Sequence, residues 1–230
     1  MTGGGTPPIF LDIESSGIAR GSFPIEIGWA RPVRLAEGGL ALDVRSLLVR
    51  PDRSWAAEGA RWDVASEEAH GLTLERLMAE GLPAAEVCAR LDAAFAGAEV
   101  ACDTGAAGWD SDWLAALYAA AGRDQPWALS EAESGALVGR RFRAAGLDPR
   151  VCRPALEPHA PPHSHAAAED AMRFAWEWAM AEVLEGAGAA ALDPAGLKAA
   201  LADLPALLPK PRWPKPLDPS AFRRRDDAAA

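Results

Sequence analysis

Short apolar runs dominate the first fifty positions of the chain. Residues 9–14 read IFLDIE, and residues 24–34 and 40–49 form two further apolar-rich segments joined by a turn at residues 37–39. Runs of this length, bounded by glycine or proline, predict β-strands. The chain is therefore expected to begin with three strands.

The apolar spacing becomes helical beyond residue 73. Residues 73–96 fit two helical pieces broken near residues 81–83, and residues 99–102 fit a short buried strand. Three later helices are expected at residues 111–121, 130–145 and 166–184, each ended by a glycine at 122, 146 or 186. Three strands followed by alternating helices and strands predict an α/β layer architecture with a mixed sheet.

The composition changes after Gly186. Residues 187–230 contain a Gly/Ala linker, a possible short helix at 194–204, and a Pro-rich stretch with several lysines and arginines. Pro-rich sequence favours extended chain and cannot build a core. We therefore expect a flexible N-terminus at 1–8, one folded domain at 9–186, and a partly ordered Pro-rich C-terminal tail at 187–230 that packs on the domain or reaches a protein partner.

The composition excludes several classes of protein. Half of the 230 residues are apolar, so one sizeable core can form, and the three cysteines show neither zinc-site nor disulfide spacing. No stretch approaches the roughly 20 apolar residues of a membrane span, and residues 1–8 lack the features of a signal peptide. We expect a cytoplasmic protein without membrane contact.

Charge argues against a protein that coats duplex DNA. Lysine and arginine total 23 against 33 acidic residues, a net charge of −10, whereas tight duplex binders present a broad basic face. An enzyme that holds one strand end through bound cations needs less basic surface, because the ions are the largest local charges. The acidic stretch at residues 63–103 further favours a short single-stranded substrate.

Asp12 and Glu14 are two apart in an otherwise apolar strand, so alternation places both carboxylates on one face. Two acids in such a strand repel each other and lose hydration unless a cation or hydrogen-bond donors compensate. Divalent ions such as Mg²⁺ prefer carboxylate oxygens. The alternative is the end of an edge strand with both acids in solvent.

His165 and Asp170 lie at the head of the last long helix, in the sequence HSHAAAEDA. An acid just over one turn beyond a histidine can face the same cleft, and imidazole suits proton abstraction from water near neutral pH. The neighbouring His159 and His163, in a Pro-rich loop, fit solvated residues or an adventitious metal-binding cluster better than catalytic groups.

Asp110 follows the expected strand at 99–102 and starts a helix. An acid there can cap the helix or reach a cleft at the strand ends. Asp103 and Asp112 are rival acids in the same stretch. The aromatic-Asp-x-x-aromatic-Leu pattern favours Asp110.

Five segments in order resemble one known family. DIE at 12–14, WDSDWL at 109–114 and HAAAEDA at 165–171 are similar to the three motifs of the DEDDh branch of the DEDD superfamily of 3′–5′ exonucleases. FPIEIGWA at 23–30 resembles the family's second strand, and AHGLT at 69–73 resembles its HG loop. The resemblance covers roughly residues 9 to 185, and the agreement of five ordered segments makes chance improbable.

The resemblance implies a ribonuclease-H-like fold with a mixed five-stranded sheet flanked by helices, and hydrolysis assisted by two divalent cations, Mg²⁺ or Mn²⁺. Asp12, Glu14 and Asp170 would hold one ion, Asp12 would also bind the second, and Asp110 would act partly through water. His165 would be the general base. The implied substrate contacts are His70, the backbone at Ser15, Ser16 and Gly17, and Trp109 near the cleft.

Several functions remain open at this point. The enzyme would release nucleoside monophosphates from single-stranded DNA or RNA 3′ ends, or would be an RNA-specific exoribonuclease or oligoribonuclease. A non-catalytic partner-binding module on a nuclease fold, and an inactive nuclease fold, are the other classes. Many members of the branch are dimers, so a homodimer is a further possibility.

Overall fold

A computed structural model of the protein describes residues 6–36, 39–57 and 62–202. Within these ranges four strands form one mixed sheet, in the order β3-β2-β1-β4. β1 and β2 pair antiparallel, as do β2 and β3, whereas β1 and β4 run parallel. The strands are β1 (Ile9–Ser15), β2 (Pro24–Arg34), β3 (Leu40–Leu48) and β4 (Val100–Ala101).

The expectation of a fifth strand is wrong for the described part of the chain. Beside β4, Leu129 forms only an isolated parallel bridge with Val100, and Ser130 N–H donates to the Val100 carbonyl at 2.7 Å. This pairing also delays the helix expected at 130–145 until Ser134, because residues 129–130 are extended along β4.

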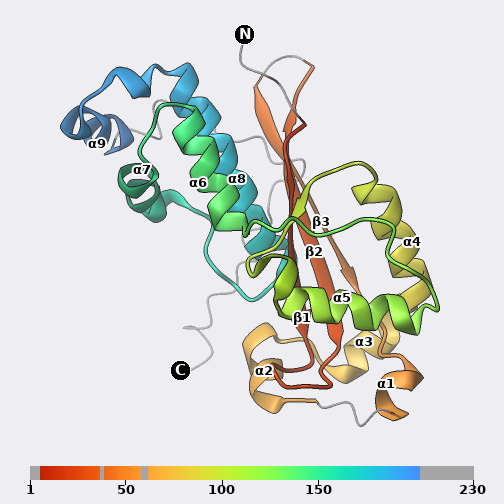
Figure 1. Ribbon diagram of the computed structural model, residues 1–230. Coiled ribbons are helices and arrows are strands. Elements are labelled where there is room, and N and C mark those ends of the chain that lie inside the picture. Colours follow the sequence, from red (N-terminus) through yellow and green to blue (C-terminus); the bar gives the residue numbers. More distant parts are fainter. Residues whose placement is uncertain (1–5, 37–38, 58–61, 203–230) are drawn as a thin grey trace, which may run out of the picture.

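Helices cover both faces of the sheet (Figure 1). α8 and α6 lie on one side, and α4 lies on the other. Three short helices, α1, α2 and α7, have too few residues for a clear apolar period, and the sequence did not predict them. The helices of the described ranges are α1 (Arg53–Ala57), α2 (Val64–His70), α3 (Leu74–Glu80), α4 (Ala84–Phe95), α5 (Trp109–Ala120), α6 (Ser134–Ala144), α7 (Pro149–Leu156), α8 (Ala167–Gly186) and α9 (Pro194–Ala202).

Two apolar cores flank the sheet because β1 alternates between them. Its residues Ile9, Leu11 and Ile13 pack with side chains of α4 and α5. Phe10 points the other way, into a cluster formed with α6, α7 and α8. Burying one large apolar side chain contributes about 1.5–3 kcal/mol, so both faces of β1 anchor the fold.

The described part of the C-terminal appendage folds back on the domain. Ala189 and Leu197 are buried in the cluster that contains α6, α7 and α8. The helix expected at 194–204 is present as α9. The Pro-rich stretch beyond residue 202 and most of the turn at 37–39 lie outside the described residues.

The cysteines are free and buried, as small apolar residues would be. Among the described residues, no helix is long and apolar enough to cross a membrane.

Candidate active site

The α8-facing side of the sheet changes from apolar to acidic along β1. After Phe10, the next two positions on this face are Asp12 and Glu14. Their antiparallel partners on β2 are Gly28 and Glu26. The pairing therefore gathers three carboxylates at one end of a face that is otherwise filled by apolar side chains.

Gly28 allows α8 to approach this acidic end closely. A Cβ atom at Gly28 would lie 2.1 Å from the Ala167 carbonyl carbon and 2.1 Å from the Ala168 nitrogen. Such a distance is far below ordinary contact, so only glycine fits opposite the first turn of α8. The first turn of this helix is thereby pressed onto the strand pair that carries the acids.

The close approach brings Asp170 to the strand acids. Asp170 lies in the first turn of α8 and is 5% exposed. Oxygen atoms of Asp12, Glu14 and Asp170 lie within 4.8 Å of one another. The sequence analysis predicted these three residues as metal ligands, and the structure brings them together.

Burial raises the pKa of Asp12 well above its ordinary value, and the negative charges of Glu14, Asp110 and Asp170 raise it further. A carboxyl group in this situation is unfavourable as a lone anion. Hard divalent cations compensate such clustered carboxylates, and an all-oxygen donor set suits Mg²⁺ or Mn²⁺. The residues present therefore fit the implied cations.

Asp110 lies beside Asp12 but outside this three-residue group. β4 runs parallel to β1, so both strands finish at the same end of the sheet. The turn after β4 lies at this end, where α5 begins. The Thr104 hydroxyl donates to Asp110 Oδ2 at 3.0 Å, and burial raises the pKa of Asp110. No side chain caps α5, so the capping alternative for Asp110 does not apply.

His165 lies in the loop that leads into α8, and its backbone is strained. Its φ of 54° is left-handed, which costs a non-glycine residue about 1–2 kcal/mol. The backbone N–H groups of Ser164 and His165 donate to the two oxygens of Asp170, at 3.0 and 3.1 Å. The carboxylate thus holds the turn that presents the imidazole at the surface.

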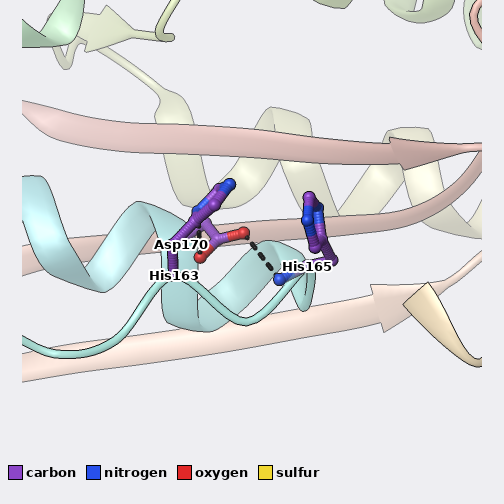
Figure 2. A group of neighbouring side chains, drawn as sticks. All are labelled: His163, His165 and Asp170. Carbon is purple, nitrogen blue, oxygen red and sulfur yellow. Dashed lines mark hydrogen bonds and ion pairs between the residues drawn. The ribbon is translucent and has the colours of Figure 1, made fainter. Parts of the chain in front are cut away.

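His163 contacts the same carboxylate, which the sequence did not indicate. Its Nδ1 lies 2.8 Å from Asp170 Oδ1, and its ring centroid is 4.7 Å from that of His165 (Figure 2). The sequence interpretation treated His163 as a solvated loop residue or part of an adventitious cluster. Its side chain is indeed 61% exposed, but it joins the cluster around Asp170.

Glu26 is a further acid that the sequence analysis did not single out. Its Oε2 accepts a hydrogen bond from Ala167 N–H at 3.2 Å, whereas Ala166 provides no side-chain cap. Burial raises the pKa of Glu26. Glu26 therefore satisfies a free donor of the first turn of α8 from across the sheet. Alternation places Glu26 on the same face of β2 as Gly28, but its position opposite Glu14 depends on the register of β1 and β2.

The loop after β1 is built by the serines predicted to lie near substrate. Ser15 Oγ donates to the Gly17 carbonyl at 2.8 Å, and Ser16 Oγ accepts from Phe23 N–H at 3.0 Å. A Cβ atom at Gly17 would lie 3.1 Å from Asp63 Cβ. These contacts fix the backbone of the loop, and its proximity to a nucleotide stays a prediction.

The other two predicted substrate residues lie on separate helices. Trp109, at the start of α5 next to Asp110, is 43% exposed and stacks on Trp113 with ring centroids 6.0 Å apart. His70 ends α2, where its Nδ1 accepts from Leu72 N–H at 3.0 Å. The role of His70 in binding a substrate also stays a prediction.

Comparison with solved structures assigns this chain an exonuclease fold. The sequence itself matches no protein-family model and no curated protein. Solved structures of exonuclease I are among those that the fold matches. Its zinc-bound form from E. coli, in complex with single-stranded DNA, matches with a TM-score of 0.52 and 15% identity over 80% of this chain and 41% of that chain.

Two further structures of exonuclease I agree. The E. coli enzyme in complex with a dA16 oligonucleotide gives a TM-score of 0.51 and 13% identity over 89% of this chain and 46% of that chain. A structure of exonuclease I that addresses processivity gives a TM-score of 0.52 and 15% identity over 86% of this chain and 44% of that chain. The chain thus spans less than half the length of these proteins, and the likeness at this identity concerns the fold.

Proposed function

We propose that the chain is a metal-dependent 3′–5′ exonuclease that releases nucleoside monophosphates from single-stranded nucleic-acid ends. The observation that carries the proposal is the convergence of Asp12, Glu14 and Asp170, with oxygens within 4.8 Å, below the loop that presents His165. The shared fold with exonuclease I supports it, since that protein is seen with single-stranded DNA.

The four carboxylates would together bind two divalent cations. Asp12, Glu14 and Asp170 would hold one, Asp12 would also contact the second, and Asp110 would act partly through water. Bound cations of this kind stabilise the charge that develops on the attacking and leaving oxygens of a phosphodiester. Mg²⁺ and Mn²⁺ both suit the oxygen donors.

His165 is the proposed general base. The DEDDh pattern assigns proton transfer to this histidine, and its exposed imidazole has a nitrogen within 4.8 Å of an Asp170 oxygen. One of its ring nitrogens would take the proton of the attacking water. The water oxygen would bond to phosphorus while the bond from phosphorus to the 3′ oxygen of the preceding nucleotide breaks. That oxygen would take a proton from solvent and leave as the new 3′ hydroxyl.

We expect the substrate to be a single strand and not a duplex. Trp109 offers an exposed indole beside Asp110, and stacking of one base on such a ring contributes about 1–3 kcal/mol. The ribose 2′-hydroxyl decides between RNA and DNA. RNA-specific trimming is the second candidate, and a partner-binding module without activity is the third.

The test is degradation of 5′-labelled single-stranded DNA and RNA with Mg²⁺, Mn²⁺ or EDTA. Native protein is compared with Asp12→Asn and His165→Ala. The matched controls are Asp112→Asn, an exposed acid of α5, and His159→Ala, an exposed histidine at the end of the 3-10 helix that precedes the His165 loop. A metal-dependent ladder shortening from the 3′ end, lost in the first two variants and kept in the controls, supports the proposal. No ladder with either metal and either polymer would overturn it.

A further inference from the structure

A second candidate metal site adjoins the three-acid group. It consists of His163, His165 and Asp170, whose nitrogen and oxygen atoms lie within 4.8 Å of one another. Figure 2 shows both histidines on the loop that enters α8, with the Asp170 carboxylate beside them. Both imidazoles are exposed, while Asp170 is buried, so the site opens to solvent on its nitrogen side.

The donor set of this group differs from that of the acids. Two imidazole nitrogens and one carboxylate oxygen suit borderline transition metals, above all Zn²⁺ and Cu²⁺, far better than Mg²⁺. Three protein ligands with one open position are the usual arrangement of an accessible zinc site. The chain therefore places a nitrogen-rich site next to an oxygen-only site.

The geometry needs little adjustment to accept an ion. Zinc ligands lie about 2.0–2.2 Å from the metal, so in a tetrahedral site their donor atoms are roughly 3.3 Å apart. His163 Nδ1 now lies 2.8 Å from Asp170 Oδ1, and the two rings are 4.7 Å apart. Small rotations of two exposed side chains suffice, with the ion replacing the contact between His163 and Asp170.

The anchoring ligand is already fixed. Ser164 and His165 donate backbone hydrogen bonds to both oxygens of Asp170, and the left-handed residue His165 turns the loop so that its ring and that of His163 lie on the same side. Metal-binding carboxylates are commonly oriented by hydrogen bonds of this type. The ordering cost of binding is therefore reduced.

We infer that His163, His165 and Asp170 bind one Zn²⁺-class ion, and that this ion competes with the catalytic cations. The competition follows from shared residues. An ion on the histidines draws Asp170 into its coordination and occupies the imidazole of His165. Zinc binding rests on the side chains alone, whereas its inhibitory effect rests on the proposed exonuclease function.

Direct binding tests the site without any activity. The full chain, without an affinity tag, is freed of metal with EDTA, exchanged into buffer, and titrated with Zn²⁺ against a chromophoric chelator. Native protein, His163→Ala and the matched control His159→Ala are compared, with circular dichroism to verify folding. We expect His163→Ala to lose one bound zinc or to bind it at least about 10-fold more weakly, with His159→Ala unchanged.

Equal zinc stoichiometry and affinity in native protein and His163→Ala would overturn the site. The second arm measures inhibition by Zn²⁺ at saturating Mg²⁺, each protein being normalised to its own rate without zinc. A rightward shift of the inhibition curve in His163→Ala, absent in His159→Ala, supports competition, and superimposed curves refute it. Zinc binding without any nuclease activity would reject the proposed function and leave the metal site intact.

Discussion

Replacement of Gly28 by alanine tests how the fold builds the acidic cluster. The added Cβ would lie 2.1 Å from backbone atoms of Ala167 and Ala168. Carbon contacts are comfortable at about 3.5–4.0 Å, so the first turn of α8 must move away by roughly 1.5 Å. Both clashing partners are backbone, so no side-chain rotation can relieve the overlap.

The displacement has two measurable effects. Overpacking of this kind costs about 1–3 kcal/mol, and we expect the upper half of that range for Gly28→Ala in urea unfolding. Because the same turn carries Asp170, a misplacement of about 1 Å is expected to lower kcat/KM for strand trimming roughly 100-fold.

Gly186, at the other end of α8, provides the control. A Cβ there meets no atom within 4 Å, so Gly186→Ala should be neutral or more stable by up to about 1 kcal/mol, with unchanged activity. If Gly28→Ala unfolds at the same urea concentration as Gly186→Ala and trims at the same rate, the close approach of α8 does not position the site.

Three further predictions concern side chains of the cluster. Without metal, the pKa of Asp12 is raised in the folded chain, so the unfolded chain loses this proton at lower pH. The free energy of unfolding therefore falls as pH rises from the ordinary carboxyl range through the raised pKa. Asp12→Asn should flatten this pH dependence of urea unfolding in EDTA, and an unchanged profile would contradict the prediction. Glu26→Ala should cost about 1 kcal/mol through the unsatisfied Ala167 N–H, while Glu26→Gln, which retains an acceptor, should lose much less in the same assay. Trp109→Ala should raise KM for single strands about 5- to 150-fold with little change in kcat in steady-state kinetics, and a change confined to kcat would refute a stacking role.

Much of the fold follows from local patterns. The three N-terminal strands and the long helices were predictable because each is long enough to show an apolar period bounded by glycine or proline. The fifth strand, which the family resemblance implied, is missing from the described residues. Pairing at Leu129 stops after one bridge, and the length of such pairing depends on tertiary context. α1, α2 and α7 have five to eight residues, too few for a period to stand out.

The candidate site was predictable where strand alternation or motif order applied. Asp12 and Glu14 share a face by the period of two, and the order of motifs singled out Asp170 and His165. His163 could not be predicted to contact Asp170, because that contact depends on the left-handed backbone at His165. Alternation on a single strand gives no cross-strand partner, so the position of Glu26 opposite Glu14 required the register of β1 and β2.

The acidic end of the sheet opposes the stability of the chain when no cation is bound. Burial and the neighbouring acids raise the pKa of Asp12, so its ionised form is disfavoured in the folded state. Any ion that binds only the folded chain recovers stability, by about 2.7 kcal/mol at a concentration 100 times its dissociation constant. Asp170 allows two kinds of ion to restore this stability, since it belongs both to the group with Asp12 and Glu14 and to the group with His163 and His165. The metal that occupies Asp170 would then set both the stability of the domain and the availability of His165, which links metal supply to activity through one buried carboxylate.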